Sequence, residues 1–370
     1  MHLKPFPPAR ALAAMSAAAV IALASAATAA LPPGALGERD PALLPAETKP
    51  LASQALLLDV VRTSAGLFAV GERGILLRST DEGRTWEQRP LPTRLTMTSI
   101  ATAAGDLWVG GHGGQIFRSS DNGETWVRQR IELWSPDAAG PTSGAPILDL
   151  HFLDASNGFA IGAFSLMLRT RDGGVSWTPV TLPKPEPEAP AEGEDAAGDG
   201  IDWTFSADEL ELDGAVDPHL NAIASTPDGA LFIAGERGAM FRSLDGGEQW
   251  ERLDFPYDGS MFGLVTWGPG HVLAYGLRGH AFESLDAGAT WAQLDTGTEV
   301  ALQGGVALDS GGVVLVGNEG LLLRRDDAAS ALRRDTHQTG RGETPLLTSV
   351  VPLEGRLLLI GEKGVAEHEF

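Results

Sequence analysis

The chain contains no cysteine, only two tyrosines, and far fewer basic than acidic residues. Without cysteine there can be no disulfide, no cysteine-zinc site and no iron–sulfur cluster, so packing alone must stabilise the fold. The 27 Lys and Arg are outnumbered by 49 Asp and Glu, which gives a formal net charge of -22. Such a surface repels nucleic acid and anionic lipid. The composition therefore excludes thiol chemistry and nucleic-acid binding as a main function.

Long apolar runs are absent after the first thirty residues. Two basic residues precede a small apolar stretch, Ala11–Ala26, and Ala27-Thr28-Ala29 then offers an A-x-A cleavage site. This pattern predicts a Sec signal peptide over residues 1–30, cleaved near Ala29. The stretch is too short and too alanine-rich for a good membrane anchor, and no cysteine follows it to make a lipoprotein. We therefore expect an exported bacterial protein, periplasmic or secreted, with no transmembrane span after cleavage.

A repeated octet is the main feature that the sequence does have. The pattern S-x-D-x-G-x-T-W appears five times, as STDEGRTW, SSDNGETW, TRDGGVSW, SLDGGEQW and SLDAGATW. The octets recur about every 40 residues, apart from two longer gaps, which is the size of a four-stranded propeller blade. The repeat therefore predicts an all-β propeller.

Each octet belongs to a longer unit with a first strand, a turn, a second strand, a G-x-x-G hairpin and a third strand before it, and a fourth strand after it. The sixth unit, from Leu302, loses its octet after LLLRRDD, and the seventh, from near Leu346, reaches GEKG without a fourth strand. After a linker over residues 31–41, we predict a seven-bladed β-propeller over residues 42–370. Because propellers avoid open strand edges, Pro45–Lys49 is predicted to close the ring as the outer strand of blade seven.

The residues of the octet suit a tight turn between the third and fourth strands. Its Asp can accept N–H groups of its own turn, its Gly can adopt a positive φ, and its Trp can bury a large ring where blades meet. We interpret the octet as a structural motif and not as a catalytic one. Its residues are Asp81, Gly83, Trp86, Asp121, Gly123, Trp126, Asp172, Gly174, Trp177, Asp245, Gly247, Trp250, Asp286, Gly288 and Trp291.

The octet resembles the Asp-box, or bacterial neuraminidase repeat, of sialidases and other propellers. The whole pattern over residues 42–370 is similar to the photosynthesis system II assembly and stability factor family. That resemblance implies an exported, non-enzymatic, seven-bladed propeller with Asp-boxes. A role in photosynthesis follows from the resemblance only.

The motifs of the chain give little support to an enzymatic function. A sialidase needs an arginine triad and a tyrosine nucleophile, yet the chain has no Arg-Ile-Pro motif, and Tyr275 lies within a predicted strand. The tripeptide FRS, at Phe117 and Phe241, leads only into an octet. A glycosidase with a carboxylate pair stays open, because sequence cannot pair the acidic residues. The eight histidines match no metal motif and no glycine-rich stretch matches a nucleotide loop, so no metal or cofactor is expected.

The G-x-x-G hairpins carry a second repeated feature. Their third position is basic in four units, and a histidine lies near it in another; the residues are Arg73, Arg237, Arg278, Lys363 and His112. In a propeller these turns lie on the face opposite the octets, where repetition places several cations around one channel mouth. Two interpretations stay open: each is a solvated turn residue, or together they bind carboxylates or an acidic peptide. The resemblance agrees with the second, because a basic patch of that family is thought to meet its partner.

The two longer gaps between octets are insertions expected on the hairpin face. Residues 183–218 are rich in Asp and Glu, and their first half has a disordered composition. The shorter insertion brings Trp134. Both can be tolerated surface loops, or the acidic insertion can fold over the cations as a lid.

The sequence as a whole favours a non-enzymatic propeller that binds a protein partner, as a scaffold or assembly factor for a membrane-associated complex at the envelope. The alternative is a glycan-binding or glycoside-hydrolysing propeller. A carboxylate pair with an aromatic platform in a pocket would favour sugar, and a broad basic surface would favour protein. The oligomeric state stays open.

Overall fold

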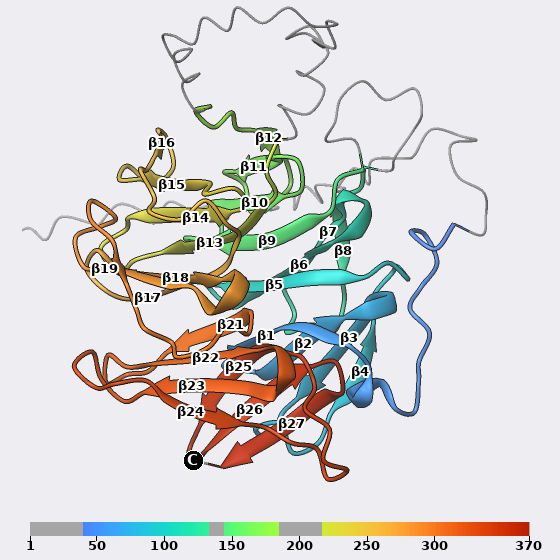
Figure 1. Cartoon of the computed structure of the whole chain (residues 1–370). Helices are drawn as coiled ribbons and strands as arrows, with labels where there is room; N and C mark the ends of the chain where they lie inside the picture. Colours follow the sequence, from blue (N-terminus) through green and yellow to red (C-terminus); the bar gives the residue numbers. More distant parts are fainter. Residues whose placement is uncertain (1–39, 133–143, 185–216, 370) are drawn as a thin grey trace, which may run out of the picture. The chain divides into compact units, whose positions relative to one another are not determined.

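The computed structural model describes residues 40–132, 144–184 and 217–369 (Figure 1). These residues form seven antiparallel sheets, so the chain is a seven-bladed β-propeller, as predicted. The predicted signal peptide, the linker up to residue 39 and most of both insertions lie outside the described residues. Within the described part, the only helices are short 3-10 turns, and none is long or apolar enough to cross a membrane.

Each sheet takes its strands from one continuous stretch of chain. The first three blades are β1 (Leu57–Thr63), β2 (Gly66–Gly71), β3 (Ile75–Ser79) and β4 (Glu87–Pro90); β5 (Met97–Ala103), β6 (Asp106–Gly111), β7 (Ile116–Ser119) and β8 (Val127–Arg130); and β9 (Ile147–Phe152), β10 (Gly158–Gly162), β11 (Met167–Thr170) and β12 (Thr178–Pro179). The next three are β13 (Leu220–Ser225), β14 (Leu231–Gly235), β15 (Met240–Ser243) and β16 (Glu251–Arg252); β17 (Met261–Gly268), β18 (His271–Gly276), β19 (Ala281–Ser284) and β20 (Ala292–Gln293); and β21 (Leu302–Ala307), β22 (Val313–Gly317), β23 (Leu321–Arg325) and β24 (Arg333–Thr336). The seventh blade has β25 (Leu347–Leu353), β26 (Arg356–Gly361) and β27 (Gly364–Glu369).

The 3-10 turns occupy two kinds of place. One, η1 (Ala52–Gln54), precedes the first blade. The others lie in hairpins between second and third strands: η2 (Glu72–Gly74), η3 (His112–Gly114), η4 (Leu277–Gly279) and η5 (Asn318–Gly320).

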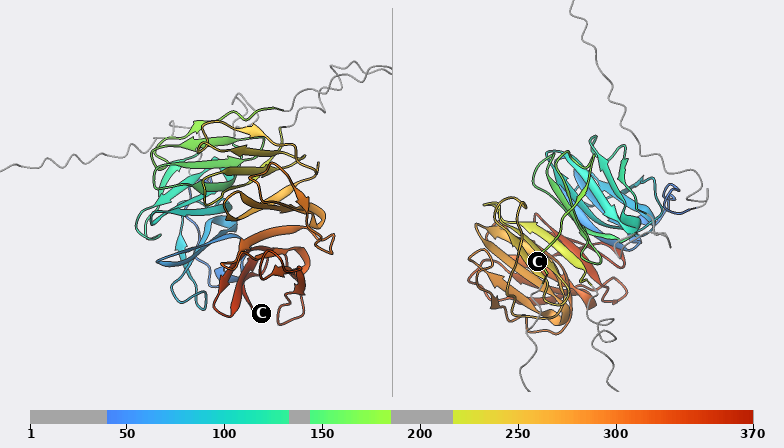
Figure 2. Two further views of the ribbon diagram at one scale, coloured as in Figure 1. Left: turned by 90° about the vertical axis from the view of Figure 1, so that its left-hand side faces the viewer. Right: turned by 90° about the horizontal axis from the view of Figure 1, so that it is seen from above.

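The first strand of every blade lies toward the centre of the ring. These strands, β1, β5, β9, β13, β17, β21 and β25, contact one another in turn, and β25 contacts β1 (Figure 1). Early blades, in blue to green, and later blades, in yellow to red, lie on opposite sides of the ring (Figure 2). Second strands are buried on both faces because a neighbouring sheet packs on each side, and Phe68, Ala69 and Val70 of β2 are fully buried.

Packing closes the ring between blades seven and one. Leu57 and Val60 share an apolar cluster with Val351, Leu358 and Ile360. In addition, the hydroxyl of Thr348 donates to the carbonyl of Leu57 at 2.9 Å. The seam is therefore made of side chains, and no strand pairing crosses it among the described residues.

The prediction that Pro45–Lys49 forms the outer strand of blade seven was wrong. Pro45–Lys49 forms no strand and runs beside the outer strand of blade one, where the Ala46 N–H donates to the carbonyl of Leu91 at 2.9 Å. The Lys49 N–H likewise donates to the side chain of Gln88 at 2.8 Å. Counting back along the repeat locates a spare segment, but it does not determine which sheet edge that segment meets. The seventh sheet consequently has three strands.

Candidate functional site

Each octet folds into a small hydrogen-bonded turn, as the first copy shows. The Ser79 hydroxyl donates to Asp81 Oδ1 at 2.8 Å and accepts the N–H of Gly83 at 2.8 Å. Asp81 also accepts the N–H and the hydroxyl of Thr85, at 2.9 and 2.6 Å. The hydrogen bond from the hydroxyl of the seventh octet residue, a Thr, is the main reason why the pKa of the carboxyl falls to about 2 in Asp81, Asp121 and Asp286.

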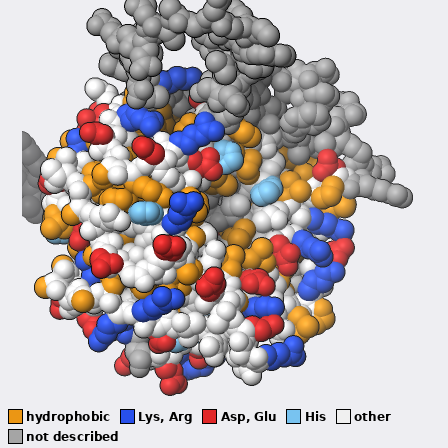
Figure 3. Space-filling view, in the orientation of Figure 1, with side chains coloured by type: hydrophobic (Ala, Val, Ile, Leu, Met, Phe, Trp, Pro, Cys, Tyr) orange, Lys and Arg blue, Asp and Glu red, His pale blue; other side chains and the backbone are white. Residues whose placement is uncertain are grey.

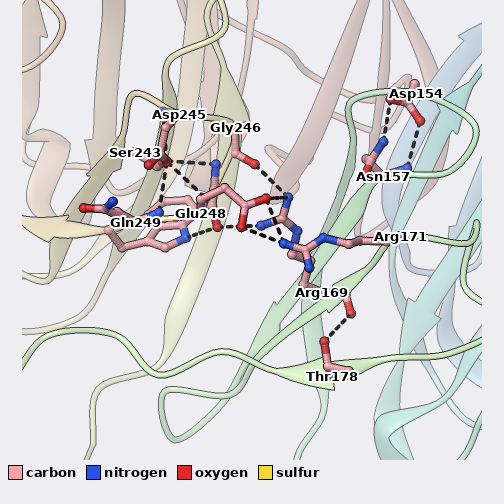
Figure 4. Close-up of polar contacts among 12 residues, drawn as sticks. Asp154, Asn157, Arg169, Arg171, Thr178, Ser243, Asp245, Gly246, Glu248 and Gln249 are labelled. Carbon is pink, nitrogen blue, oxygen red and sulfur yellow. Dashed lines mark hydrogen bonds and ion pairs between the residues drawn. The ribbon is translucent and has the colours of Figure 1, made fainter.

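The octet also receives side chains from the preceding blade. A Cβ on Gly247 would lie 2.2 Å from Cζ of Phe159, so only glycine leaves room for that ring. Arg169 of β11 is buried and donates to the carbonyls of Gly247 and Gly246, at 2.9 and 3.2 Å. Figure 4 shows this arginine directed at the octet turn, where Glu248 accepts from it.

Arginines on third strands make similar contacts around the ring, as does Arg356 at the start of the second strand β26, and the sequence did not predict this role. Arg118 donates to the carbonyl of Gly173, Arg242 to that of Ala287, and Arg356 to that of Glu82, each in the next blade. The signal was present, because an Arg stands directly before the first Ser or Thr of four octets. These contacts give the octet face a role in joining blades.

The opposite face carries the five predicted cations, one on each of five hairpins. Arg73, Arg237 and Arg278 are exposed and each has a φ of 54°, the left-handed conformation of a tight turn. His112 and Lys363 are exposed as well, and Lys363 lies 3.5 Å from Glu343.

The cations do not form an uninterrupted ring. In the sixth blade, Glu319 occupies the position that Arg73 holds in the first, with a φ of 58°. On the side of the molecule that Figure 3 shows, Lys and Arg are interspersed with Asp and Glu. The series of hairpin cations is therefore interrupted by an anion in the sixth blade.

A hollow of about 630 Å³ lies beside Arg73, between blade one and the segment that precedes it. Leu51 and Ile75 contribute apolar surface, and Leu51 is 63% exposed. Arg94 lies 2.9 Å from Glu47 at the rim, and the neighbouring Lys49 contributes most to lowering the pKa of the Glu47 carboxyl. The hollow thus combines apolar surface with a rim that holds three cations, Lys49, Arg73 and Arg94, and two glutamates, Glu47 and Glu72.

A second hollow of about 630 Å³ lies beside Arg278, between blades five and six. Its lining is polar and of both signs, with Asp295, Glu299 and Arg334. It has no Trp, Tyr or Phe in its lining, so it offers no aromatic platform for a sugar ring.

A polar cluster at the ring centre was not anticipated. Asp59 accepts the N–H of Ile100 at 2.9 Å, and Asp149 accepts the N–H of Ile223 and the hydroxyl of Ser99, both at 2.9 Å. Burial raises the pKa of Asp59 to about 7 and that of Asp149 to about 6. Each carboxylate therefore joins its own blade to the first strand of the next.

Tyr275 reaches the same centre from blade five. A Cβ on Gly263 would lie 2.1 Å from its hydroxyl oxygen, so the absent side chain gives the ring its space. Burial, and then the charges of Asp149 and Asp59, raise the pKa of Tyr275. Across the described residues, no group of three or more His, Asp or Glu is placed to hold a metal ion.

Sequence comparisons match part of the chain. Residues 44–142 match the model of the Photosynthesis system II assembly factor YCF48 family. The Photosystem II assembly lipoprotein Ycf48 of Synechococcus sp. (strain CC9902) is 30% identical over 122 residues, which cover 28% of this chain and 35% of that protein. The Photosystem II assembly protein Ycf48 of Synechococcus sp. (strain JA-2-3B'a(2-13)) is 31% identical over 130 residues, covering 30% and 38%. These matches span little more than a third of the curated relatives.

Comparisons of structure extend over most of the chain. The solved structure "YCF48 bound to D1 peptide" matches with a TM-score of 0.59 and 15% identity, covering 85% of this chain and 92% of that one. YCF48 from Cyanidioschyzon merolae matches with a TM-score of 0.59 and 18% identity, covering 86% and 97%. A streptogramin B lyase matches with a TM-score of 0.63 and 12% identity, covering 85% and 93%.

Together, the comparisons confirm the resemblance to the photosystem II assembly factor family and the propeller fold. Because a lyase shares this fold, the fold does not itself decide between binding and catalysis.

Proposed function

We propose that this chain is a non-enzymatic propeller that binds a peptide segment of a membrane-associated complex and acts as an assembly factor, like the photosystem II factors that it resembles. The observation that carries the proposal is the hollow beside Arg73. Its lining residues fall between Pro41 and Arg94, almost wholly within residues 44–142, where the chain matches the family model.

The chemistry of the hollow suits a peptide with a carboxylate next to aliphatic side chains. Leu51 and Ile75 offer apolar contact, and Arg73 can form a bidentate contact with a carboxylate. Arg94 and Lys49 are both engaged by Glu47, so Arg73 is the rim cation left to meet a ligand. The solved YCF48 structure with a D1 peptide supports a peptide as the class of ligand.

An envelope location outside the cytoplasm completes the proposal. The Sec-type pattern of residues 1–30 supports export, and the lipoprotein among the relatives supports attachment of such factors to a membrane surface. A glycan-processing function finds less support, because neither hollow pairs carboxylates with an aromatic platform.

Affinity capture tests this function with two matched charge reversals. Arg73→Glu lies at the hollow, whereas Arg62→Glu lies on the same blade at the exposed end of β1. We expect the full chain to capture a membrane complex from solubilised envelopes, Arg62→Glu to retain it, and Arg73→Glu to weaken capture at least about tenfold, or about 1.4 kcal/mol. Failure to capture any protein, or equal capture by both variants, would contradict the proposed site.

A further inference from the structure

The seventh blade presents a strand edge that the other six blades cover. In those blades the third strand pairs with an antiparallel fourth strand, but β27 pairs only with β26 among the described residues. The turn η1 packs beside the Gly364 end, where a Cβ would lie 2.0 Å from the carbonyl oxygen of Ser53. From Val365 to Glu369, no described main-chain group bonds to the outer side of β27. Alternate residues of this strand therefore direct their N–H and C=O groups outward without a strand partner.

A hollow lies next to this edge. It has a volume of about 300 Å³ and lies between blades six and seven, lined in part by residues of β24, β26 and β27. Leu322 and Leu357 line its apolar part, and Arg333 and His368 line its polar part. A strand added to β27 would place alternate side chains over this hollow.

The side chains of β27 differ from those of the other third strands. Aligned at the hairpin glycine, Glu367 and Glu369 take the places of Leu77 and Ser79, which are about 1% exposed in blade one. Both glutamates are exposed, and Glu367 also lies 3.1 Å from the guanidinium of Arg356 in β26. Charges on an open edge oppose pairing between two copies of the same edge, and they favour a strand of opposite charge.

The fourth strands of this propeller show what such an edge accepts. Four of the six carry arginine, namely Arg89 in β4, Arg128 and Arg130 in β8, Arg252 in β16, and Arg333 and Arg334 in β24. In three of these strands, β8, β16 and β24, an arginine pairs with the position that Glu367 takes in β27, whereas β12 and β20 carry no arginine.

We propose that the outer edge of β27 binds an extended segment of a partner protein, which adds antiparallel as the fourth strand of blade seven and places basic side chains beside Glu367 and Glu369. The main-chain ladder supplies affinity, and the alternating side chains supply specificity. This site uses residues other than those of the hollow beside Arg73, so it goes beyond the proposed function and can fail independently of it.

A peptide of the chain's own blade-two sequence serves as the probe. The nonapeptide ETWVRQRIE, residues 124–132, contains a complete basic fourth strand. In fluorescence anisotropy with the full chain we expect saturable binding with a Kd on the order of 10 to 100 μM, and none with a scrambled peptide. Glu367→Lys/Glu369→Lys should weaken binding at least about tenfold. The control, Glu354→Lys/Glu362→Lys, makes the same charge change on exposed turns of the same blade. It should leave the binding of the peptide unchanged.

Hydrogen exchange identifies what covers the edge. We expect the outward amides of β27 to exchange rapidly in the free protein and slowly with the peptide. Protection in the free chain that disappears when residues 1–39 are removed would show that the chain fills its own edge. Protection that rises with protein concentration would assign the edge to a second copy. No saturable binding would show that the glutamates serve only against aggregation, and each of these three results overturns the proposal.

Discussion

At the scale of single residues, Asp59 and Asp149 hold protons more strongly in the fold than in the open chain. Burial raises their pKa values to about 7 and 6, from an ordinary value of 3.8. At pH values between the unfolded and the folded pKa, the folded state binds more protons than the unfolded state. The contribution of these residues to the free energy of unfolding therefore rises as the pH falls from about 7 toward about 4. The neighbouring His151 acts in the opposite sense, because burial lowers its pKa to about 4.

Comparing Asp59→Asn with the wild type isolates the contribution of Asp59 to the pH dependence of stability. The loss of unfolding free energy relative to the wild type should be larger at pH 5 than at pH 8, by up to about 1.4 kcal/mol per pH unit within the window. His151 titrates in both proteins and cancels in the comparison. Urea denaturation at the two pH values measures the difference. Asp309→Asn, at an exposed turn, is the control, and an Asp59→Asn effect that is equal at both pH values would contradict the assignment.

At the scale of elements, the octet is both a turn and a surface for the preceding blade. Substitutions at Gly246 and Gly247 can tell these two roles apart. Both glycines have a positive φ, of 71° and 83°, so both serve the turn. A Cβ on Gly246 meets nothing within 4 Å, whereas one on Gly247 lies 2.2 Å from Phe159. We expect Gly246→Ala to cost about 1 kcal/mol from backbone strain alone. Gly247→Ala should cost about 3 kcal/mol, because the Phe159 ring must also move. Similar denaturation midpoints for the two variants would show that the octet does not position the adjacent blade.

The elements that could be predicted from sequence are those with local causes. The octet forms its hydrogen bonds within a few residues, so its pattern predicted the turns and, through their repetition, the seven blades. The exposed hairpin cations followed from the same alignment. The position of Pro45–Lys49 depends on contacts with Gln88 and Leu91 about forty residues away, which no local pattern encodes.

The candidate site, too, could be predicted from sequence only where its causes are local. The Arg73 position was predicted from its hairpin, but the hollow beside it exists only because the segment around Leu51 folds back on blade one. The polar cluster at the centre combines Asp59, Asp149 and Tyr275 from three blades. The spacing of these residues in the sequence does not predict that they lie close together.

At the scale of the whole molecule, the ring closes at a seam that no described strand crosses. In this respect the seam between blades seven and one differs from the other six, where the chain itself passes from one blade to the next. Leu358 is fully buried in the seam, and its side chain lies against the octet glycine Gly83. Opening of the ring should therefore begin there, because packing is its main restraint.

Leu358→Ala and Leu273→Ala remove the same side chain from two different seams. Both leucines are fully buried, and each substitution should cost about 2 to 5 kcal/mol. Only Leu358→Ala should selectively accelerate hydrogen exchange in β25, β26 and β1, because it weakens the one seam that can separate without unfolding a blade. Leu273→Ala, between blades five and six, should lower stability without that local opening. If both variants accelerated exchange evenly around the ring, closure would be as strong at the seam as within the continuous chain, and an open β27 edge would be harder for an incoming strand to reach.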